Sequence, residues 1–200
     1  LLASPLNPLG RLVAALSAEK DICVRLTAVQ AIDTLLPHCE GVPTLLQSTF
    51  EGAAPALLQL ANDCERVESR SLCLDVLSNF ITYVGATGGS IQNEILNTIA
   101  SPLSTIWNNA TDQNLLLRRS VLTILSSIAA FVGPESCSVL YPMALPMIDD
   151  SFAKEENMFA VEEALKLWLV FLRLSKTYDP LMGRLFLHAV KLSKDLTHLM

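Results

Sequence analysis

The sequence has few aromatic and few charged residues, 6% and 17% of its 200 residues, whereas 51% are hydrophobic. Its five cysteines are odd in number and none form a Cys-x-x-Cys pair. We interpret them as small core residues of a protein in a reducing compartment. No apolar run approaches the roughly 20 residues that a membrane-spanning helix needs, so we expect no membrane insertion.

Several kinds of functional site are also missing. The net charge of −6 argues against direct nucleic-acid binding, because phosphate contacts need clustered Lys and Arg, while it permits basic partners. His38, His188 and His198 match no metal-ligand spacing. Residues 85–90 are glycine-rich, but no strand precedes them and no Lys-Ser or Lys-Thr follows. We therefore predict no catalytic residue, no metal and no cofactor, and we do not expect an enzyme.

Helical periodicity is what the sequence does have. In residues 21–36, Ile22, Val29 and Leu36 recur at i, i+7 and i+14, with further apolar residues between them. Asp21 can cap this helix and Pro37 stops it. No window alternates at period two, which excludes most β architectures. The pattern predicts an all-α fold with helices at about 6–18, 21–36, 43–61, 66–84, 90–108, 112–132, 136–150, 158–175 and 180–199.

The predicted helices form pairs with a regular period. Arg25, Arg70 and Arg119 each open the apolar part of a second helix, and Glu162 takes that place in the last pair. These positions are 45, 49 and 43 residues apart. A period of about 40–47 residues with two helices per unit indicates HEAT repeats, and predicts an α-solenoid of about four and a half antiparallel pairs. The expected units of this single array are residues 1–40, 41–86, 87–133, 134–177 and, in part, 178–200.

Two features of the repeats need a structural explanation. Residues 9–36 are similar to the HEAT consensus, so we predict that Asp21 and Arg25 pair between neighbouring repeats. The alternative is that Asp21 only caps its helix and Arg25 is solvated. Pro142 and Pro146 lie inside a predicted helix, where an interior proline costs about 3 kcal/mol. We interpret them as architectural, with Pro142 near the helix start and Pro146 bending the helix or beginning a second piece. A functional hinge is the alternative.

Two groups of residues are candidates for partner binding. One predicted turn and the helix after it are acidic, through Asp149, Asp150, Glu155, Glu156, Glu162 and Glu163. Such a patch can attract a basic partner, or it can be a solvated turn that stabilises the positive end of the next helix. Trp107 ends a first helix before a polar turn. It is either a partly exposed contact for a partner peptide or a cover for the core between repeats.

Three stretches are typical of one family. They are RRSVLTILSSIAAFVG at 118–133, VLYPMALPMI at 139–148 and EEALKLWLVFL at 162–172. The order is a helix ending in glycine, then Leu-Tyr-Pro with a following Leu-Pro, then a helix with Leu-Trp-Leu. It resembles the importin β, or karyopherin, superfamily, and most closely its importin-eleven branch. The resemblance, with a first segment that has neither Met nor a cap, leads us to expect an internal fragment.

The resemblance implies a nuclear transport receptor that shuttles between nucleus and cytoplasm. Such receptors bind protein cargo inside the solenoid, take Phe-Gly repeats of nucleoporins into grooves between outer helices, and respond to Ran in its GTP state. Ran and nucleoporins would act through the full-length protein, and the resemblance assigns no Ran site here. It also implies that Glu162 and Glu163 face cargo, which suits basic import signals. The alternatives are a HEAT-repeat scaffold for protein–protein assembly and a helical enzyme domain.

Overall fold

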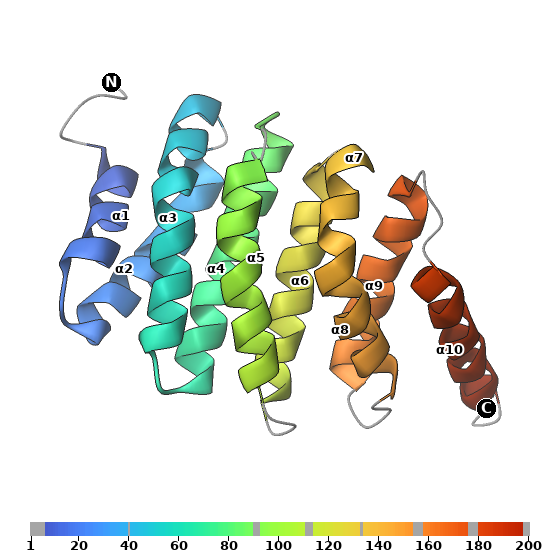
Figure 1. Cartoon of the computed structure of the whole chain (residues 1–200). Coiled ribbons are helices and arrows are strands. Elements are labelled where there is room, and N and C mark those ends of the chain that lie inside the picture. The colour runs from blue at the N-terminus through green and yellow to red at the C-terminus, as the bar shows by residue number, and fades with distance from the viewer. Residues whose placement is uncertain are drawn as a thin grey trace.

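The computed structural model describes residues 7–39, 41–89, 93–110, 114–132, 134–153, 158–175 and 180–197. These residues form helices joined by short turns, and they contain no strand. The helices stack side by side in one direction, so that the first and last helices lie at opposite ends of the array (Figure 1). The predicted all-α solenoid is confirmed.

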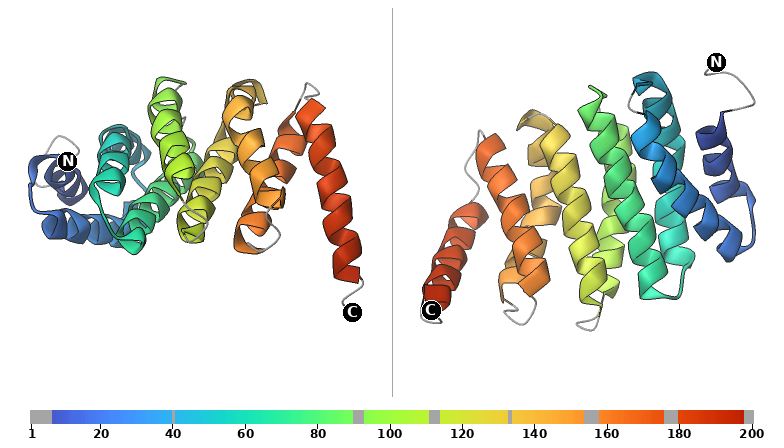
Figure 2. Two further views of the ribbon diagram at one scale, coloured as in Figure 1. Left: turned by 60° about the horizontal axis from the view of Figure 1, so that its bottom comes forward. Right: turned by 180° about the vertical axis from the view of Figure 1, so that it is seen from behind.

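The array has two layers of helices (Figure 2). The first helices of the pairs form one layer, and the second helices stack on one another in the other layer, α2 on α4, α4 on α6 and α6 on α9. The first helices are α1 (Pro8–Ala18), α3 (Pro43–Asp63), α5 (Asn93–Asn109), α8 (Tyr141–Ala153) and α10 (Pro180–Thr197). The second helices are α2 (Ile22–Leu35), α4 (Val67–Ala86), α6 (Leu115–Phe131) and α9 (Met158–Leu174). Shorter pieces are η1 (Leu36–Cys39), α7 (Pro134–Cys137) and η2 (Ser138–Leu140).

A single apolar core runs between the two layers. It is mostly aliphatic, as the composition predicts, and its few aromatic residues pack in pairs across the layers. Phe50 of α3 lies 5.8 Å from Phe80 of α4, and Tyr141 of α8 lies 5.0 Å from Phe171 of α9, measured between ring centroids. Because each helix contributes a broad apolar face to this core, no pair can bury its own face without its neighbours.

The prediction that Asp21 pairs with Arg25 is wrong. The Asp21 carboxylate caps α2 by accepting a 2.7 Å bond from the Cys23 amide, as the alternative expected. Arg25, however, is buried rather than solvated. Its Nη1 donates at 2.9 Å to Asp63 at the end of α3, in the next pair, and its Nε donates at 2.8 Å to the Leu16 carbonyl. The bond between pairs therefore exists, with a different carboxylate.

The same contact identifies the matching arginines in later pairs. Arg70 donates to the Ala61 carbonyl at 3.0 Å, and Arg118 donates to the Ala110 carbonyl at 3.1 Å. Arg118 also reaches Asp150 of the next first helix at 3.0 Å. In the third pair it is thus Arg118, and not the predicted Arg119, that makes the carbonyl contact made by Arg25 and Arg70 in the first two pairs.

The prolines do not divide the fourth first helix where the sequence suggests. Pro142 is the second residue of α8, where the missing N–H has no helical partner to lose, as predicted. The helix continues through Pro146, so the expected second piece there is wrong. The chain instead tightens before Pro142, in the 3₁₀ turn of η2, where the Tyr141 amide bonds the Ser138 carbonyl. Pro55 in α3 and Pro102 in α5 are likewise accommodated inside first helices.

Candidate partner-binding surfaces

A groove of about 220 Å³ lies between the first helices α5 and α8. Two prolines and two methionines of α8 form one wall, and a tryptophan with small polar residues of α5 forms the other. The lining residues are Ser104, Trp107, Asn108, Pro142, Met143, Pro146 and Met147. Proline has no backbone N–H and methionine is apolar and adaptable, so the groove suits an apolar side chain better than a charged one.

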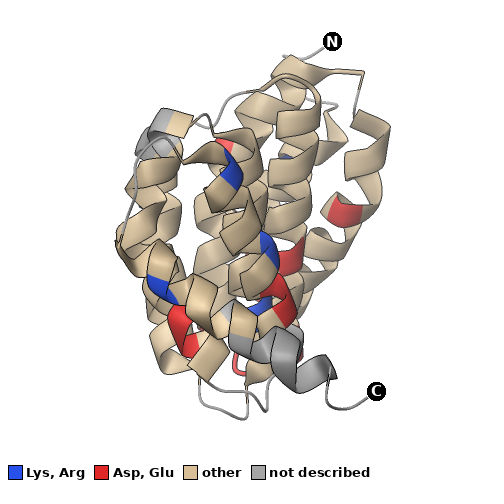
Figure 3. Ribbon diagram, turned by 90° about the vertical axis from the view of Figure 1, so that its right-hand side faces the viewer, with Lys and Arg blue, Asp and Glu red and all other residues tan. Residues whose placement is uncertain are grey.

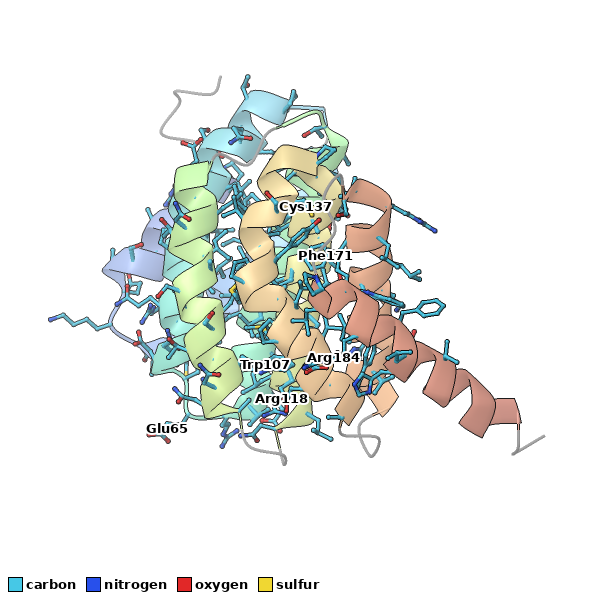
Figure 4. The ribbon with its side chains drawn as sticks, turned by 45° about the vertical axis from the view of Figure 1, so that its right-hand side comes forward. Glu65, Trp107, Arg118, Cys137, Phe171 and Arg184 are labelled. Carbon is cyan, nitrogen blue, oxygen red and sulfur yellow. The ribbon has the colours of Figure 1, made fainter. Side chains whose placement is uncertain are left out.

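Trp107 lies mostly in the core, with 6% of its surface exposed. The guanidinium of Arg118 sits over its ring, with the central carbon 5.1 Å from the ring centroid, and Figure 4 shows the two labelled residues next to each other near the C-terminal end of α5. This cation–π contact and the Asp150 ion pair fix Arg118 between two helix pairs. Trp107 therefore covers the core, as the second interpretation proposed, and it also lines the groove.

Asp149 and Asp150 are both bound by cations inside the array. Asp150 pairs with Arg118 across α8 and α6. Asp149 pairs with Arg184 of α10, and the Nε2 atom of His188 lies 3.6 Å from its other oxygen. Their charges thus join α8 to its neighbours on both sides, which leaves less negative charge for a basic partner than the sequence suggests.

The remaining acidic candidates differ in accessibility. Glu155 and Glu156 lie outside the described residues. Glu163 is buried against α6, where its carboxylate lies 4.0 Å from Arg119 and 3.0 Å from Lys166. Glu162 has 63% of its side chain exposed and pairs with Lys166 at 2.9 Å. The hydrogen bond from Lys166 lowers the pKa of Glu162, so this carboxylate is charged at neutral pH.

A second hollow, of about 210 Å³, lies on the other layer between α4 and α6. Its floor is a set of hydroxyl contacts: Ser120 donates to Asp75 at 2.9 Å, and Ser71 lies 2.8 Å from Ser120. Burial between the two helices raises the pKa of Asp75, although the two serine hydroxyls oppose the shift. Arg119 and Asn79 stand at the rim. This hollow is more polar than the α5–α8 groove, whose lining mixes apolar and polar residues.

The five cysteines are free thiols. Cys64, Cys73 and Cys137 are buried, as predicted for core residues, whereas Cys39 is partly buried and Cys23 is exposed, so the prediction is wrong for Cys23. Burial raises the pKa of Cys73 to about 12 and that of Cys137 to about 11. Such thiols hold their protons at neutral pH and react slowly. Among the described residues, no three His, Cys, Asp or Glu side chains gather in a way that could hold a metal ion. No helix in the described ranges has the length and apolar character to span a membrane.

Comparison with known proteins gives these surfaces a context. Residues 119–200 match the family model described as importin-11-like, TPR repeats. The chain is 30% identical to importin-11 of Mus musculus over 157 residues and to importin-11 of Homo sapiens over 156 residues. Each alignment covers 77% of this chain and 14% of the relative. No solved structure matches.

This chain is importin-11-like. The resemblance to the importin-eleven branch that was expected from residues 118–172 is confirmed. The chain spans about 14% of the length of the curated relatives that it matches. The importin-11-like repeat is long here: Ser71 and Ser78 meet serines 49 residues further on, nearer to a HEAT unit than to the roughly 34 residues of a TPR.

Sequence reasoning missed both hollows. Each is formed by residues of two helices that are adjacent only after the pairs stack, so neither could be read from one amphipathic pattern. One signal was present for the polar hollow, since Ser71 and Ser78 repeat the seven-residue spacing of Ser120 and Ser127. Paired small polar residues at one repeat length indicate close contact between second helices, and the structure shows hydrogen bonds at both levels.

Proposed function

We propose that this chain is part of an importin-type nuclear transport receptor that binds protein cargo and Phe-Gly nucleoporins. In the full-length protein, cargo binding would depend on Ran in its GTP state, and the receptor would shuttle between nucleus and cytoplasm. The observation that supports this function is the importin-11 similarity over 77% of the chain. The relatives are transport receptors by name, whereas a scaffold that is not a receptor would share only the repeat architecture.

The α5–α8 groove is the proposed site for a nucleoporin phenylalanine. It lies in the layer of first helices, and its apolar walls come from Met143, Pro146 and Trp107. A phenyl ring gains by leaving water for such a wall, and the neighbouring Asn108 and Ser104 can bond the peptide that carries the ring. Shallow grooves of this kind give weak, reversible binding, which suits passage through a crowded pore.

The groove is tested with one blocking variant and one matched variant. Ser104→Arg places a long cation in the groove, whereas Ser101→Arg makes the same change on an exposed residue of α5 outside it. A Phe-Gly repeat peptide should bind the chain, a Ser-Gly version should not, and Ser104→Arg should weaken binding at least about fivefold, the loss of roughly 1 kcal/mol. Equal binding by the two arginine variants would contradict this assignment.

The receptor function itself is tested on the full-length protein. Its bound partners are captured with and without excess Ran locked in the GTP state. Partners released by Ran-GTP support an importin, and partners gained with it indicate an exporter. Partners that ignore Ran would overturn the receptor proposal and favour an assembly scaffold. This assay does not depend on the α5–α8 groove, so either proposal can fail without the other.

A further inference from the structure

Charged and polar side chains on the second helices form a set that we call the polar row. Along the stack from α2 to α9 it consists of Asp33, Asn79, Asp75, Arg119, Glu162 and Lys166. Polar contacts join neighbouring helices along it: Asn79 donates to Asp33 at 2.8 Å, and Arg119 lies 4.0 Å from Glu163 beside Glu162. The row therefore extends over four second helices.

The sign of the charge alternates along the polar row. At its start, Asp33 and Asp75 have no Lys or Arg at ion-pair distance within the described ranges, although the charges of Arg119 and Asp33 both act on Asp75 in opposite directions. In the middle, Arg119 is half exposed, and its 4.0 Å approach to Glu163 is too long for a hydrogen bond. At its end, Lys166 pairs with both Glu162 and Glu163, and Glu163 also lies 4.0 Å from Arg119. The sequence of net charge is negative, positive, negative.

The groups on the row keep capacity for further bonds. One oxygen of Asp75 accepts the Ser120 hydroxyl at 2.9 Å, while the Ser71 hydroxyl lies 2.8 Å from Ser120 and 3.4 Å from the other Asp75 oxygen, so that oxygen can accept a further donor. Arg119 carries five N–H donors. Between these two residues lies the 210 Å³ hollow, so a partner side chain can enter at the point where the charge changes sign.

The distance between neighbouring second helices favours one backbone conformation for a peptide bound along the polar row. Packed helices lie about 8–10 Å apart. A polyproline II segment advances about 3.1 Å per residue with three residues per turn, so every third side chain projects on one side at intervals of about 9 Å. In a β-strand, side chains three residues apart point to opposite faces. A polyproline II segment therefore matches the stack of second helices.

We propose that the polar row binds an extended protein segment of polyproline II type with basic, acidic and basic side chains at every third position. The proposal rests on the function proposed above, in that the occupant is a protein partner. The first basic residue meets Asp33 and Asp75, the acidic residue meets Arg119, and the second basic residue meets Glu162. A uniformly basic segment is disfavoured by Arg119, and a nucleic-acid backbone by the three carboxylates.

The proposal is tested with two labelled peptides of identical composition. One has Lys, Glu and Lys at positions i, i+3 and i+6 with proline between them, and the other has the order Lys, Lys, Glu. Fluorescence anisotropy with the whole chain at low ionic strength should show about fivefold tighter binding of the first peptide. That factor corresponds to one exposed ion pair, and it should disappear in 0.5 M salt.

Variants of Arg119 test whether its side chain pairs with the acidic residue at the centre of the peptide. Arg119→Glu and the milder Arg119→Gln should remove the preference for the first peptide, with unchanged circular dichroism. Arg173→Glu changes the net charge equally from an exposed position near the end of α9, and it should keep the preference. Equal binding of the two peptides, no binding of either at millimolar concentration, or an equal effect of Arg173→Glu would overturn the polar row as a site. Phe-Gly binding in the other layer reports separately on the proposed function.

Discussion

Two glycines near the end of α4 are required for different physical reasons. Gly88 has φ of +79°, and the Gly88 and Gly89 amides bond the carbonyls of Gly85 and Val84, which closes the helix end in a Schellman motif. Gly85 lies inside the helix, where a Cβ atom would stand 2.0 Å from the ring of Phe131 in the next second helix. The first glycine is needed for its backbone, and the second for the close approach of α4 and α6.

Gly85→Ala is expected to destabilise the chain by about 1–3 kcal/mol, the usual cost of overpacking a fitted contact. Alanine is otherwise the better helix residue by about 1 kcal/mol, so a loss of stability identifies the clash. Urea unfolding measures the change. The cost should shrink in a Phe131→Ala background, and Gly41→Ala, where a Cβ meets no atom within 4 Å, should have little effect. A stabilising Gly85→Ala would contradict the packing described here.

Asp75 makes stability depend on pH in a defined direction. Partial burial raises its pKa in the folded state above the ordinary value, so the folded chain binds this proton more tightly than the unfolded chain does. The contribution of Asp75 to the free energy of unfolding therefore decreases as pH rises from the ordinary pKa through the raised one. Asp75→Asn should gain stability relative to the native chain between pH 3.5 and 7, as measured by urea unfolding at several pH values. Glu65→Gln, at an exposed carboxylate, is the control for the removal of one negative charge. If Asp75→Asn were less stable than the native chain between pH 3.5 and 7 after the effect of this control is subtracted, the raised pKa of Asp75 would not be a source of the pH dependence.

At this scale the sequence predicts residue types better than contacts. It predicted that Asp21 caps a helix, because a cap depends on neighbours two or three residues away. It could not predict that Arg25 would bond Asp63, 38 residues on, or that Gly85 would face Phe131, because those partners meet only when the repeats stack. The predicted helix therefore ended at residue 84, although Gly85 lies within α4.

Helices, the next scale, are where the sequence was most informative. Their existence and order follow from apolar spacing, and most predicted ends lie within three residues of those observed. The exception is the predicted helix at 136–150, which is divided into α7, η2 and α8. Periodicity cannot distinguish a 3₁₀ turn from an α-helical one over three residues, so the division at Ser138–Leu140 is visible only in the hydrogen bonds.

Adjacent arginines at the start of α6 provide a direct test of how helices are joined. Arg118 is buried, bonds Asp150 and the Ala110 carbonyl, and covers Trp107, whereas Arg119 is half exposed. Arg118→Leu should cost about 2 kcal/mol, since it leaves a partly buried carboxylate without its cation. Arg119→Leu should change stability by no more than about 0.5 kcal/mol. Thermal and urea unfolding compare the two.

A double-mutant cycle measures the interaction energy between Arg118 and Asp150. Asp150→Ala combined with Arg118→Leu should cost less than the sum of the single changes, by about 1 kcal/mol, because the two side chains interact directly. Additive losses would mean that Arg118 stabilises α6 through Trp107 and the carbonyl alone.

At the scale of the whole molecule, the stacking of helix pairs explains why charged side chains are few and why positive and negative ones lie close together. Seen from the end where α10 lies, the described ribbon carries few charged residues, and positive and negative ones lie near each other (Figure 3). Many of them join one pair to the next, as in Arg25–Asp63, Arg118–Asp150 and Arg184–Asp149. The sequence predicted the repeat and its period, but it treated the acidic turn as one surface patch. Position in the stack, which the sequence does not encode locally, turns part of that patch into connections between helices.

The face of the last two helices predicts how the 200-residue chain behaves alone. Large apolar side chains are exposed there, with Phe186 58% and Leu187 68% accessible on α10 and Leu169 47% accessible on α9. In each earlier pair, a second helix covers the equivalent faces. We therefore expect the chain to self-associate as its concentration rises, and sedimentation velocity to show species larger than a monomer. Leu187→Glu combined with Leu169→Glu should restore the monomer, whereas Leu116→Glu, at an apolar residue 41% exposed on α6, should not. A chain that stays monomeric at several hundred micromolar would contradict this prediction, because the exposed apolar side chains of α9 and α10 would then not drive association.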